Sequence, residues 1–170
     1  MKLILAGDGE HGKDEVAKRM TQRFGLKCTS SSAEANRRFI FGALQPIMSY
    51  KSEDECYSDR RNHRALWYEL IRAYNTHDRA RLGRDIFERS DVYVGIRDDE
   101  ELRAIREAGL VDAVVWVDAR ERKEREAGSS ISVGWKDADY VLNNNVPLDC
   151  IDREIDRLWH WLQDIARKVA

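Results

Sequence analysis

Short apolar runs alternate with amphipathic stretches along the whole chain. Five apolar runs have the length of buried strands, and they cover residues 2–6, 27–29, 91–96, 113–117 and 140–142. Apolar residues at helical spacing predict helices at 12–24, 33–45, 60–74, 79–88, 98–108 and 148–169, whereas the polar stretch 50–55 predicts a loop. This alternation indicates an α/β, three-layer fold: a parallel sheet of about five strands with helices on both faces.

The composition narrows the class of protein. The 170 residues fit one domain, 1–170, and the net charge of −2 argues against binding nucleic acid by bulk charge, so any phosphate contacts must come from local arginine clusters. The cysteines have no metal-ligand spacing and fit a reducing compartment. No apolar run approaches a membrane span and the first residues do not read as a signal peptide, so we expect a cytoplasmic protein with no membrane partner. The sequence leaves open whether it forms a homodimer.

A glycine-rich stretch, "GDGEHGKD", joins the first predicted strand to the first predicted helix. Gly7, Gly12 and Lys13 match the phosphate-binding pattern G-x-x-x-x-G-K-[ST], but Asp14 stands where Ser or Thr is usual. In this context the backbone N–H groups and the helix N-terminus bind phosphate, and Lys13 reaches the β- and γ-phosphates of ATP. The competing interpretation is an ordinary strand-to-helix turn. The residues predicted to bind the nucleotide are Gly7, Asp8, Gly9, Glu10, His11, Gly12, Lys13, Asp14 and Glu15.

Asp14 is chemically acceptable at its position. A carboxylate is a hard oxygen ligand that suits Mg²⁺, which it can hold directly or through a water, and it also suits the N-terminal end of a helix dipole. Its repulsion from the phosphates would be offset by the metal and by Lys13. We therefore predict Asp14 as the metal ligand, while Glu15 also reads as a solvated helix residue.

The acceptor side is predicted in the segment "SDRRNHRALW". Arg60 and Arg64 lie four residues apart, where a helix would gather their guanidiniums for phosphate binding, and Trp67 is a candidate to stack a base. Asp59 is a candidate catalytic base for an acceptor hydroxyl. The alternatives stay open: Trp67 as a core residue, the arginines as a solvated face, and Asp59 as a helix N-cap.

Four further positions are candidates by their place in the pattern. Arg97 ends a predicted strand, where a loop would hold it over the site as a catalytic residue, and Arg37 follows the second strand as an acceptor ligand. Arg120 belongs to a predicted mobile lid, 119–130, that would cover ATP. Asn144 follows the last strand, at a position that would border the adenine ring. Each has a plain alternative: surface ion pairs for the arginines, and a turn for Asn144.

These motifs resemble a known family. "GKD", "DVYVGIRDDEELRAIREAG", "AVVWVDARER" and "ADYVLNNN" resemble, in this order, the phage deoxynucleoside monophosphate kinases, which are thymidylate kinase-like P-loop kinases. The segment "ECYSDRRNHRALWYELIRAYN" is similar to the phage kinases that phosphorylate 5-hydroxymethyluracil within DNA. The resemblance implies a P-loop kinase fold, ATP with Mg²⁺, binding at residues 7–14 and a functional Arg97. No separate nucleotide-enclosing insertion is apparent.

Three functional hypotheses follow. The first is ATP-dependent phosphorylation of the hydroxymethyl group of 5-hydroxymethyldeoxyuridine in phage DNA, a step in thymine hypermodification. The second is a deoxynucleoside monophosphate kinase, whose acceptor is a free deoxynucleotide and needs no base. The third is a nucleotide-binding protein without kinase activity. Both kinase hypotheses depend on positioning and charge neutralisation.

Overall fold

Five parallel strands form the centre of the protein. A computed structural model describes residues 1–124 and 131–169. The strands are β1 (Leu3–Ala6), β2 (Cys28–Ser30), β3 (Val92–Val94), β4 (Ala113–Asp118) and β5 (Tyr140–Asn143), in the spatial order β2-β3-β1-β4-β5. Every neighbouring pair runs parallel. The predicted parallel sheet is therefore confirmed, and β1 stands at its centre, where the order of the strands reverses.

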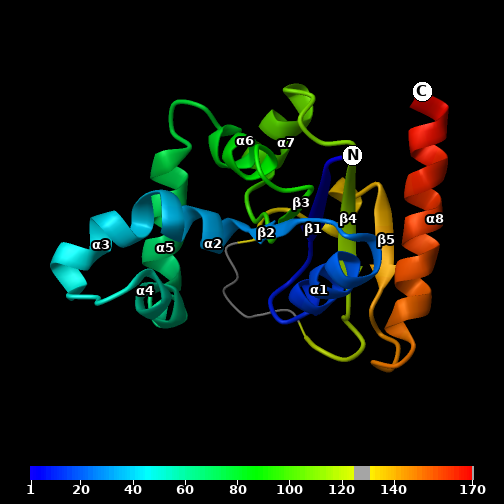
Figure 1. Ribbon diagram of the computed structural model, residues 1–170, viewed down its shortest axis with the longest axis horizontal. Coiled ribbons are helices and arrows are strands. Elements are labelled where there is room, and N and C mark those ends of the chain that lie inside the picture. The colour runs from blue at the N-terminus through cyan, green and yellow to red at the C-terminus, as the bar shows by residue number, and fades with distance from the viewer. Residues whose placement is uncertain (125–130, 170) are drawn as a thin grey trace.

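Helices cover both faces of this sheet, as Figure 1 shows. On one face lie α1 (Lys13–Phe24) and the long terminal α8 (Ile151–Val169), which pack on alternate strand residues such as Leu3 and Leu5. On the other face lie α2 (Ser31–Ala35), α6 (Arg81–Phe87) and α7 (Asp99–Glu107), packed on Ile4 and Tyr93. A short 3-10 turn, Trp135–Asp137, precedes β5. Because successive strand residues point to opposite faces, the continuous apolar runs form two separate cores.

A helical extension projects beyond the β2 edge of the sheet. It contains a π-helical segment (Asn36–Ile40), α3 (Phe41–Met48), α4 (Glu53–Asp59) and α5 (Arg64–Tyr74), and Figure 1 shows α3, α4 and α5 standing to one side of the strands. Phe39 stacks on Tyr74 at 4.2 Å between ring centroids, which joins the two ends of the extension. The sequence had shown no separate insertion, yet this extension supplies one wall of the site described below.

Two predictions about this extension were wrong, and a third placed the end of a helix too early. The stretch 50–55 was expected to be a loop, but α4 begins at Glu53 because the Ser52 side chain accepts the Glu55 N–H at 3.1 Å. The helix expected to begin at residue 60 begins at Arg64, and residues 60–63 form a turn. The predicted helix 33–45 continues to Met48 with Pro46 inside its last turns, where the missing N–H removes one helical bond.

The helices of the protein are short or carry many charged residues. None of those in residues 1–124 and 131–169 is long and apolar enough to cross a membrane.

Candidate active site

One cavity of about 740 Å³ opens beside the carboxyl ends of β1, β2 and β3. Ligands in parallel α/β sheets bind at this end of the strands, next to the point where the strand order reverses. The residues that the phosphate-loop segment contributes to the cavity are Gly7, Gly9, Glu10, Lys13 and Asp14. Ser30, Ser31 and Ser32 line it next to β2, and α5 and the start of α7 complete the walls. The cavity therefore joins the predicted donor site to the predicted acceptor segment.

The geometry of the loop requires glycine at both motif positions, Gly7 and Gly12. Gly12 has a φ of 88°, and a Cβ there would collide with the amide nitrogen of Asn144. Gly7 has a φ of 151°, and a Cβ there would lie 2.7 Å from the carbonyl oxygen of Val117. Only glycine adopts these conformations with so little space, so the loop has the compact backbone that the sequence motif predicts.

The Lys13 ammonium lies over the loop itself. It donates to the carbonyl oxygens of Gly7 at 2.9 Å and of Asp8 at 2.6 Å. Asp14, the next residue, is exposed and lines the same cavity at the first turn of α1. A positive charge and a hard oxygen ligand therefore stand side by side where the helix N-terminus already favours anions.

His11 and Asn144 lie behind the loop and fix it to the sheet. His11 is fully buried; its Nδ1 accepts the Ala119 N–H at 3.2 Å, and its Nε2 lies 3.0 Å from the Lys123 carbonyl oxygen. Asn144 is also buried and donates from Nδ2 to the His11 carbonyl at 2.8 Å. Neither residue lines the cavity, so their observed contacts hold the loop in place. The direct nucleotide contacts expected of them stay a prediction.

Arg120, at the base of the predicted lid, is held by an ion pair. Its guanidinium donates to both carboxylate oxygens of Asp118, at 2.8 and 2.9 Å, and this hydrogen bonding lowers the pKa of Asp118. Arg122 donates to the carbonyl of Asn144 at 2.7 Å. Residues 119–124 therefore contact the ends of β4 and β5. Arg125 and the rest of the predicted lid, 125–130, lie outside the described residues.

Arginines form the opposite wall of the cavity. Arg60 packs its guanidinium on the Tyr57 ring, 3.8 Å from the centroid, and donates to the Tyr57 carbonyl at 2.8 Å. The pKa of Glu10 is lowered chiefly by its hydrogen bond with Lys123, and also by the charges of Arg64 and Arg61. These two guanidiniums therefore act across the cavity on the phosphate loop. The arginines that line the cavity are Arg60, Arg61, Arg64, Arg72, Arg79 and Arg97.

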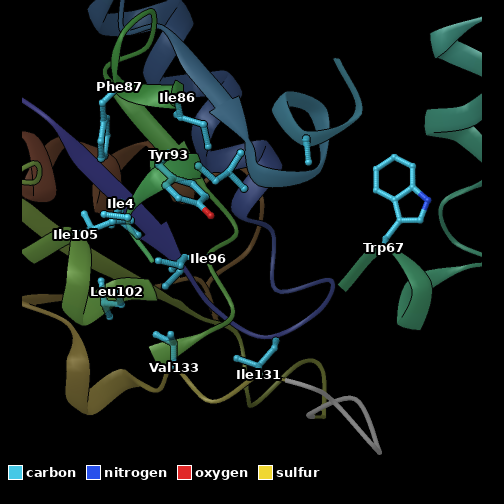
Figure 2. Packing of buried hydrophobic residues seen from close by; sticks show 14 of the residues in the cluster. Ile4, Trp67, Ile86, Phe87, Tyr93, Ile96, Leu102, Ile105, Ile131 and Val133 are labelled. Atoms are coloured by element: carbon cyan, nitrogen blue, oxygen red, sulfur yellow. The ribbon is translucent and has the colours of Figure 1, made fainter. Parts of the chain in front are cut away.

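Trp67 is a buried core residue that also lines the cavity, and its predicted stacking on a base stays a prediction. Its side chain is only 4% exposed and packs edge-on against Tyr57, with ring centroids 6.3 Å apart, as a core residue would. It also lines the cavity, and Figure 2 shows it across from the side chains packed on the sheet. Its indole Nε1 is buried and makes no hydrogen bond within the described part of the chain. Trp67 is thus a rigid apolar side of the acceptor wall.

Asp59 is engaged in local contacts. Its carboxylate accepts the Tyr50 hydroxyl at 2.6 Å and the Asn62 side-chain amide at 2.6 Å, and it lies 3.0 Å from His63 Nε2. Hydrogen bonds from Tyr50 and Asn62 lower its pKa, and the carboxylate is not among the groups that line the cavity. Asp59 is the last residue of α4 and does not cap α5. These contacts favour a structural role, and the catalytic-base role stays a prediction.

Arg37 and Glu15, two other predicted site residues, form ion pairs outside the cavity. Arg37 donates to both carboxylate oxygens of the buried Glu34, at 3.2 and 2.5 Å. Glu15 accepts the Arg19 guanidinium at 2.8 Å along α1, as expected of a solvated helix residue. Neither residue lines the cavity. Contacts of Arg37 with an acceptor and of Glu15 with ATP would require both pairs to rearrange.

The floor of the cavity contains polar residues that the sequence did not single out as site residues. Tyr93, Asp98 and Glu101 line it together with Asn75. Glu101 is 4% exposed and accepts the Tyr93 hydroxyl at 2.9 Å, and its burial raises its pKa to about 8. One sequence signal was available: in the helix 98–108, Glu101 shares the face of the apolar Ile105. A carboxylate on the buried face of a helix is unusual unless it has partners.

Comparisons with known proteins bear on the fold. No protein-family model matches the sequence, and no curated protein matches it significantly. The structure is similar to shikimate kinase from Aquifex aeolicus vf5, with a TM-score of 0.58, 12% identity and 98% of both chains covered. It is also similar to shikimate kinase from Bacteroides thetaiotaomicron, with a TM-score of 0.54, 12% identity, and 96% of this chain and 98% of that chain covered. The chain therefore shares the three-layer α/β fold of these two enzymes.

Proposed function

We propose that this protein transfers the γ-phosphoryl group of ATP to the hydroxymethyl group of 5-hydroxymethyldeoxyuridine in DNA. The observation that carries the proposal is the single cavity of about 740 Å³ in which Lys13 of the phosphate loop faces an arginine wall and a floor with carboxyl groups. Arginines suit the phosphates beside a target nucleotide, and a carboxyl group suits an alcohol that must lose a proton. The sequence resemblance to the phage DNA kinases points to the same acceptor.

Phosphoryl transfer from ATP to an alcohol requires that the reactants are positioned and that the phosphate charge is neutralised. The hydroxymethyl oxygen attacks the γ-phosphorus, the bond from that phosphorus to the β–γ bridging oxygen breaks, and ADP leaves with the electron pair. Lys13 and the loop N–H groups stabilise the charge on the phosphates, while Arg64 and Arg97 act from the acceptor side. The alcohol proton passes to a carboxylate. Asp98 lines the cavity and also caps α7, since its Oδ1 accepts the Glu100 N–H at 2.9 Å. Asp59 does not line the cavity, so the two carboxylates are compared as candidate bases below.

Magnesium fits the residues present. Mg²⁺ in kinases is held by one or two carboxylates together with phosphate oxygens and waters. Within the described ranges there is no group of three His, Cys, Asp or Glu side chains that would hold a metal alone. Asp14 lines the cavity beside Lys13 and supplies one hard oxygen ligand, which is sufficient when ATP brings the others. The metal would neutralise phosphate charge.

The arginine wall supports a second candidate. Six arginines also suit an acceptor that carries its own phosphate, as in a deoxynucleoside monophosphate kinase. Such an acceptor is already an anionic nucleophile and needs no base. Asp98, a carboxylate that lines the cavity, therefore favours the alcohol, whereas the number of arginines is compatible with both acceptors.

The test offers both acceptors to the purified protein. Labelled ATP and Mg²⁺ are incubated with DNA that contains 5-hydroxymethyluracil, with the same DNA containing thymine, and with each free deoxynucleoside monophosphate. We expect label in the hydroxymethyluracil DNA alone. Label only in nucleoside diphosphates would move the assignment to the second candidate. ATP hydrolysis without any labelled product would favour a nucleotide-binding protein that phosphorylates neither acceptor.

The same assay compares the two candidate bases. If Asp98 accepts the proton, Asp98→Asn lowers the rate of transfer to DNA by about 10²–10⁴-fold, the usual contribution of acid–base catalysis. Asp59→Asn would then leave the rate nearly unchanged and lower the free energy of unfolding, because it disturbs contacts with Tyr50 and His63. The opposite pattern would return the role of base to Asp59.

A further inference from the structure

The cavity differs in character between its mouth and its floor. Near the phosphate loop, the charges of Arg61 and Arg64 act on Glu10 across the opening. On the floor, the buried side chain is Glu101, in the first turn of α7 and 4% exposed. A phosphate bound in this cavity would be attracted to the charged mouth, whereas on the buried floor it would lose its hydration beside an acidic side chain. The floor therefore suits an uncharged part of the acceptor.

One buried donor fixes the Glu101 carboxyl, because the Tyr93 hydroxyl donates to it at 2.9 Å. The Asn75 side chain lies beside the carboxyl and acts to lower its pKa. Asn75 is itself fixed, because it is 3% exposed and its Oδ1 accepts the Leu82 N–H at 3.1 Å. Figure 2 shows the hydroxyl end of Tyr93 directed away from the apolar side chains packed on the sheet. The three side chains come from β3, the end of α5 and α7, so the carboxyl has one defined orientation.

The ionisation of Glu101 follows from these surroundings. Burial is the largest influence on its pKa, and the nearby negative charge of Asp98 acts in the same direction. The hydrogen bond from Tyr93, the nearby Asn75 side chain and the charge of Arg79 oppose them, and the resulting pKa is about 8. Arg79 is itself paired with Glu100 at 3.0 Å. At neutral pH the carboxyl is therefore mostly a neutral acid, which offers one O–H donor and also accepts hydrogen bonds.

We propose that Glu101, held by the Tyr93 hydroxyl, recognises a neutral donor–acceptor edge of the acceptor, such as the adjacent N–H and carbonyl of a pyrimidine base. This inference rests on the proposed function, since it concerns the acceptor of the same reaction. Enzymes that act on a base read it by hydrogen bonds to its Watson–Crick edge and by stacking. With that edge on Glu101, the opposite side of the pyrimidine is directed away from the floor. Glu101 is thus a specificity residue of the acceptor site.

A purely structural role for the same residues makes a different prediction. A buried Tyr93–Glu101 hydrogen bond that only joins β3 to α7 would affect the free energy of unfolding. It would not make the affinity for an acceptor depend on the protonation of Glu101. Affinity measured against pH therefore separates the two roles.

The experiment measures acceptor affinity with Mg²⁺ and a non-hydrolysable ATP analogue. One arm uses fluorescence anisotropy of a single-stranded oligonucleotide with one 5-hydroxymethyluracil, and the other uses calorimetry with 5-hydroxymethyl-dUMP. Glu101→Ala should weaken binding by about 10-fold or more, because the base edge loses its partners. Glu101→Gln keeps a donor and an acceptor and should stay within about threefold of the unsubstituted protein at pH 6.5. Glu107→Gln, on the exposed side of α7, is the matched control.

The pH dependence supplies the decisive readout. Between pH 6.5 and 8.5 the protonated fraction of a group with a pKa of about 8 falls about fourfold. The ratio of the acceptor affinity of the unsubstituted protein to that of Glu101→Gln should fall by the same factor. Titration of the pyrimidine base of the acceptor affects both proteins equally, so it cancels in this ratio. A constant ratio would overturn the proposal, as would unchanged binding in folded Glu101→Ala, or no binding of either acceptor to the unsubstituted protein.

Two controls separate loss of recognition from a folding defect and from loss of kinase activity. If Glu101→Ala fails to fold by circular dichroism, the ratio for Glu101→Gln decides alone. The proposed kinase activity is tested separately, because Lys13→Ala must abolish transfer from ATP. A constant ratio together with that loss would refute recognition by Glu101 and leave the kinase assignment in place. A changing ratio without ATP-dependent transfer would refute the kinase assignment and retain Glu101 as a ligand-binding residue.

Discussion

The two walls of the cavity are built in different ways. The donor wall is made of backbone: Gly7 and Gly12 bend the loop, and His11 and Asn144 fix it from behind. The acceptor wall is made of side chains from separate segments, among them the arginines of α5 and the turn before it, and Glu101 of α7. A backbone-built wall is set by one short stretch of sequence. A side-chain wall depends on how distant elements pack.

This difference implies different responses to change. In the proposed reaction the donor wall would bind phosphate, which every nucleoside triphosphate carries, so its geometry would be general to the reaction. The acceptor wall would contact the group that distinguishes one substrate from another, so its side chains would determine specificity. Substitutions in the donor wall should lower the rate with any acceptor. Substitutions in the acceptor wall should change which acceptor is used and how tightly it binds.

The largest effect is expected from Lys13→Ala. The ammonium lies against the carbonyls of Gly7 and Asp8 at the site of phosphate binding, and no other lysine lines the cavity within the described chain. Loss of one charge-stabilising group at a transferring centre lowers kcat by about 10²–10³-fold or more. Radiolabel transfer measures this, with Lys168→Ala on α8 as the control. Activity retained by Lys13→Ala would mean that the loop does not bind ATP. The assignment of this wall to the phosphate donor would then be wrong.

Arg97→Ala tests the acceptor wall and should have the next largest effect. Arg97 follows β3 and lines the cavity, so we expect the KM for the acceptor to rise about 10- to 100-fold, the usual loss for a charged hydrogen bond, with a small change in the KM for ATP. Steady-state kinetics with each substrate varied in turn measures both constants. Arg103→Ala, exposed on α7, should change neither. An equal rise in both KM values would show that the two walls are not functionally separate.

The same contrast explains what could be predicted from the sequence. The parallel sheet and the phosphate loop were predictable, because local periodicity and one contiguous motif determine them. Arg60, Arg64 and Arg97 were predicted from their places at strand and helix ends and do line the cavity, and their roles stay predictions. Glu101 was not selected, because its role appears only when β3, α5 and α7 meet. The start of α4 was missed because its Ser52 cap lies in a segment that is otherwise polar.

Asp59 shows the limit of the same reasoning. Its type and its place beside Arg60 fitted a catalytic base, and those features are local. Its partners, Tyr50 and His63, lie on either side of it in the chain and take up its carboxylate in the folded protein. The sequence contains all of these residues but not the direction in which each side chain points. Functional residues built from side chains therefore require the structure, whereas the glycine loop did not.

Gly12→Ala separates backbone strain from contact within the donor wall. Both Gly12 and Gly109 have positive φ, so either substitution by alanine should lower the free energy of unfolding by roughly 1–2 kcal/mol. A Cβ at Gly12 meets Asn144, whereas one at Gly109 meets nothing within 4 Å. Only Gly12→Ala should therefore also weaken ATP binding, measured by calorimetry beside urea unfolding. Equal effects of both substitutions on ATP affinity would contradict the fixed loop.

The smallest effect concerns Glu34, beside the acceptor wall. Burial raises its pKa, but hydrogen bonds and charges from Arg37 and Arg38 outweigh burial, and the pKa is lowered below its ordinary value of 4.5. A lowered pKa means that Glu34 stabilises the fold above the unfolded value and that this contribution disappears as the pH falls through the folded value. Between pH 6 and pH 3 the unsubstituted protein should lose about 1 kcal/mol or less beyond what Glu34→Gln loses. Urea unfolding at both pH values measures this, with Glu107→Gln as the control. A loss as large in Glu34→Gln would mean that ionisation of Glu34 adds no stability through its pair with Arg37. Arg37 could then leave Glu34 for an acceptor at little cost.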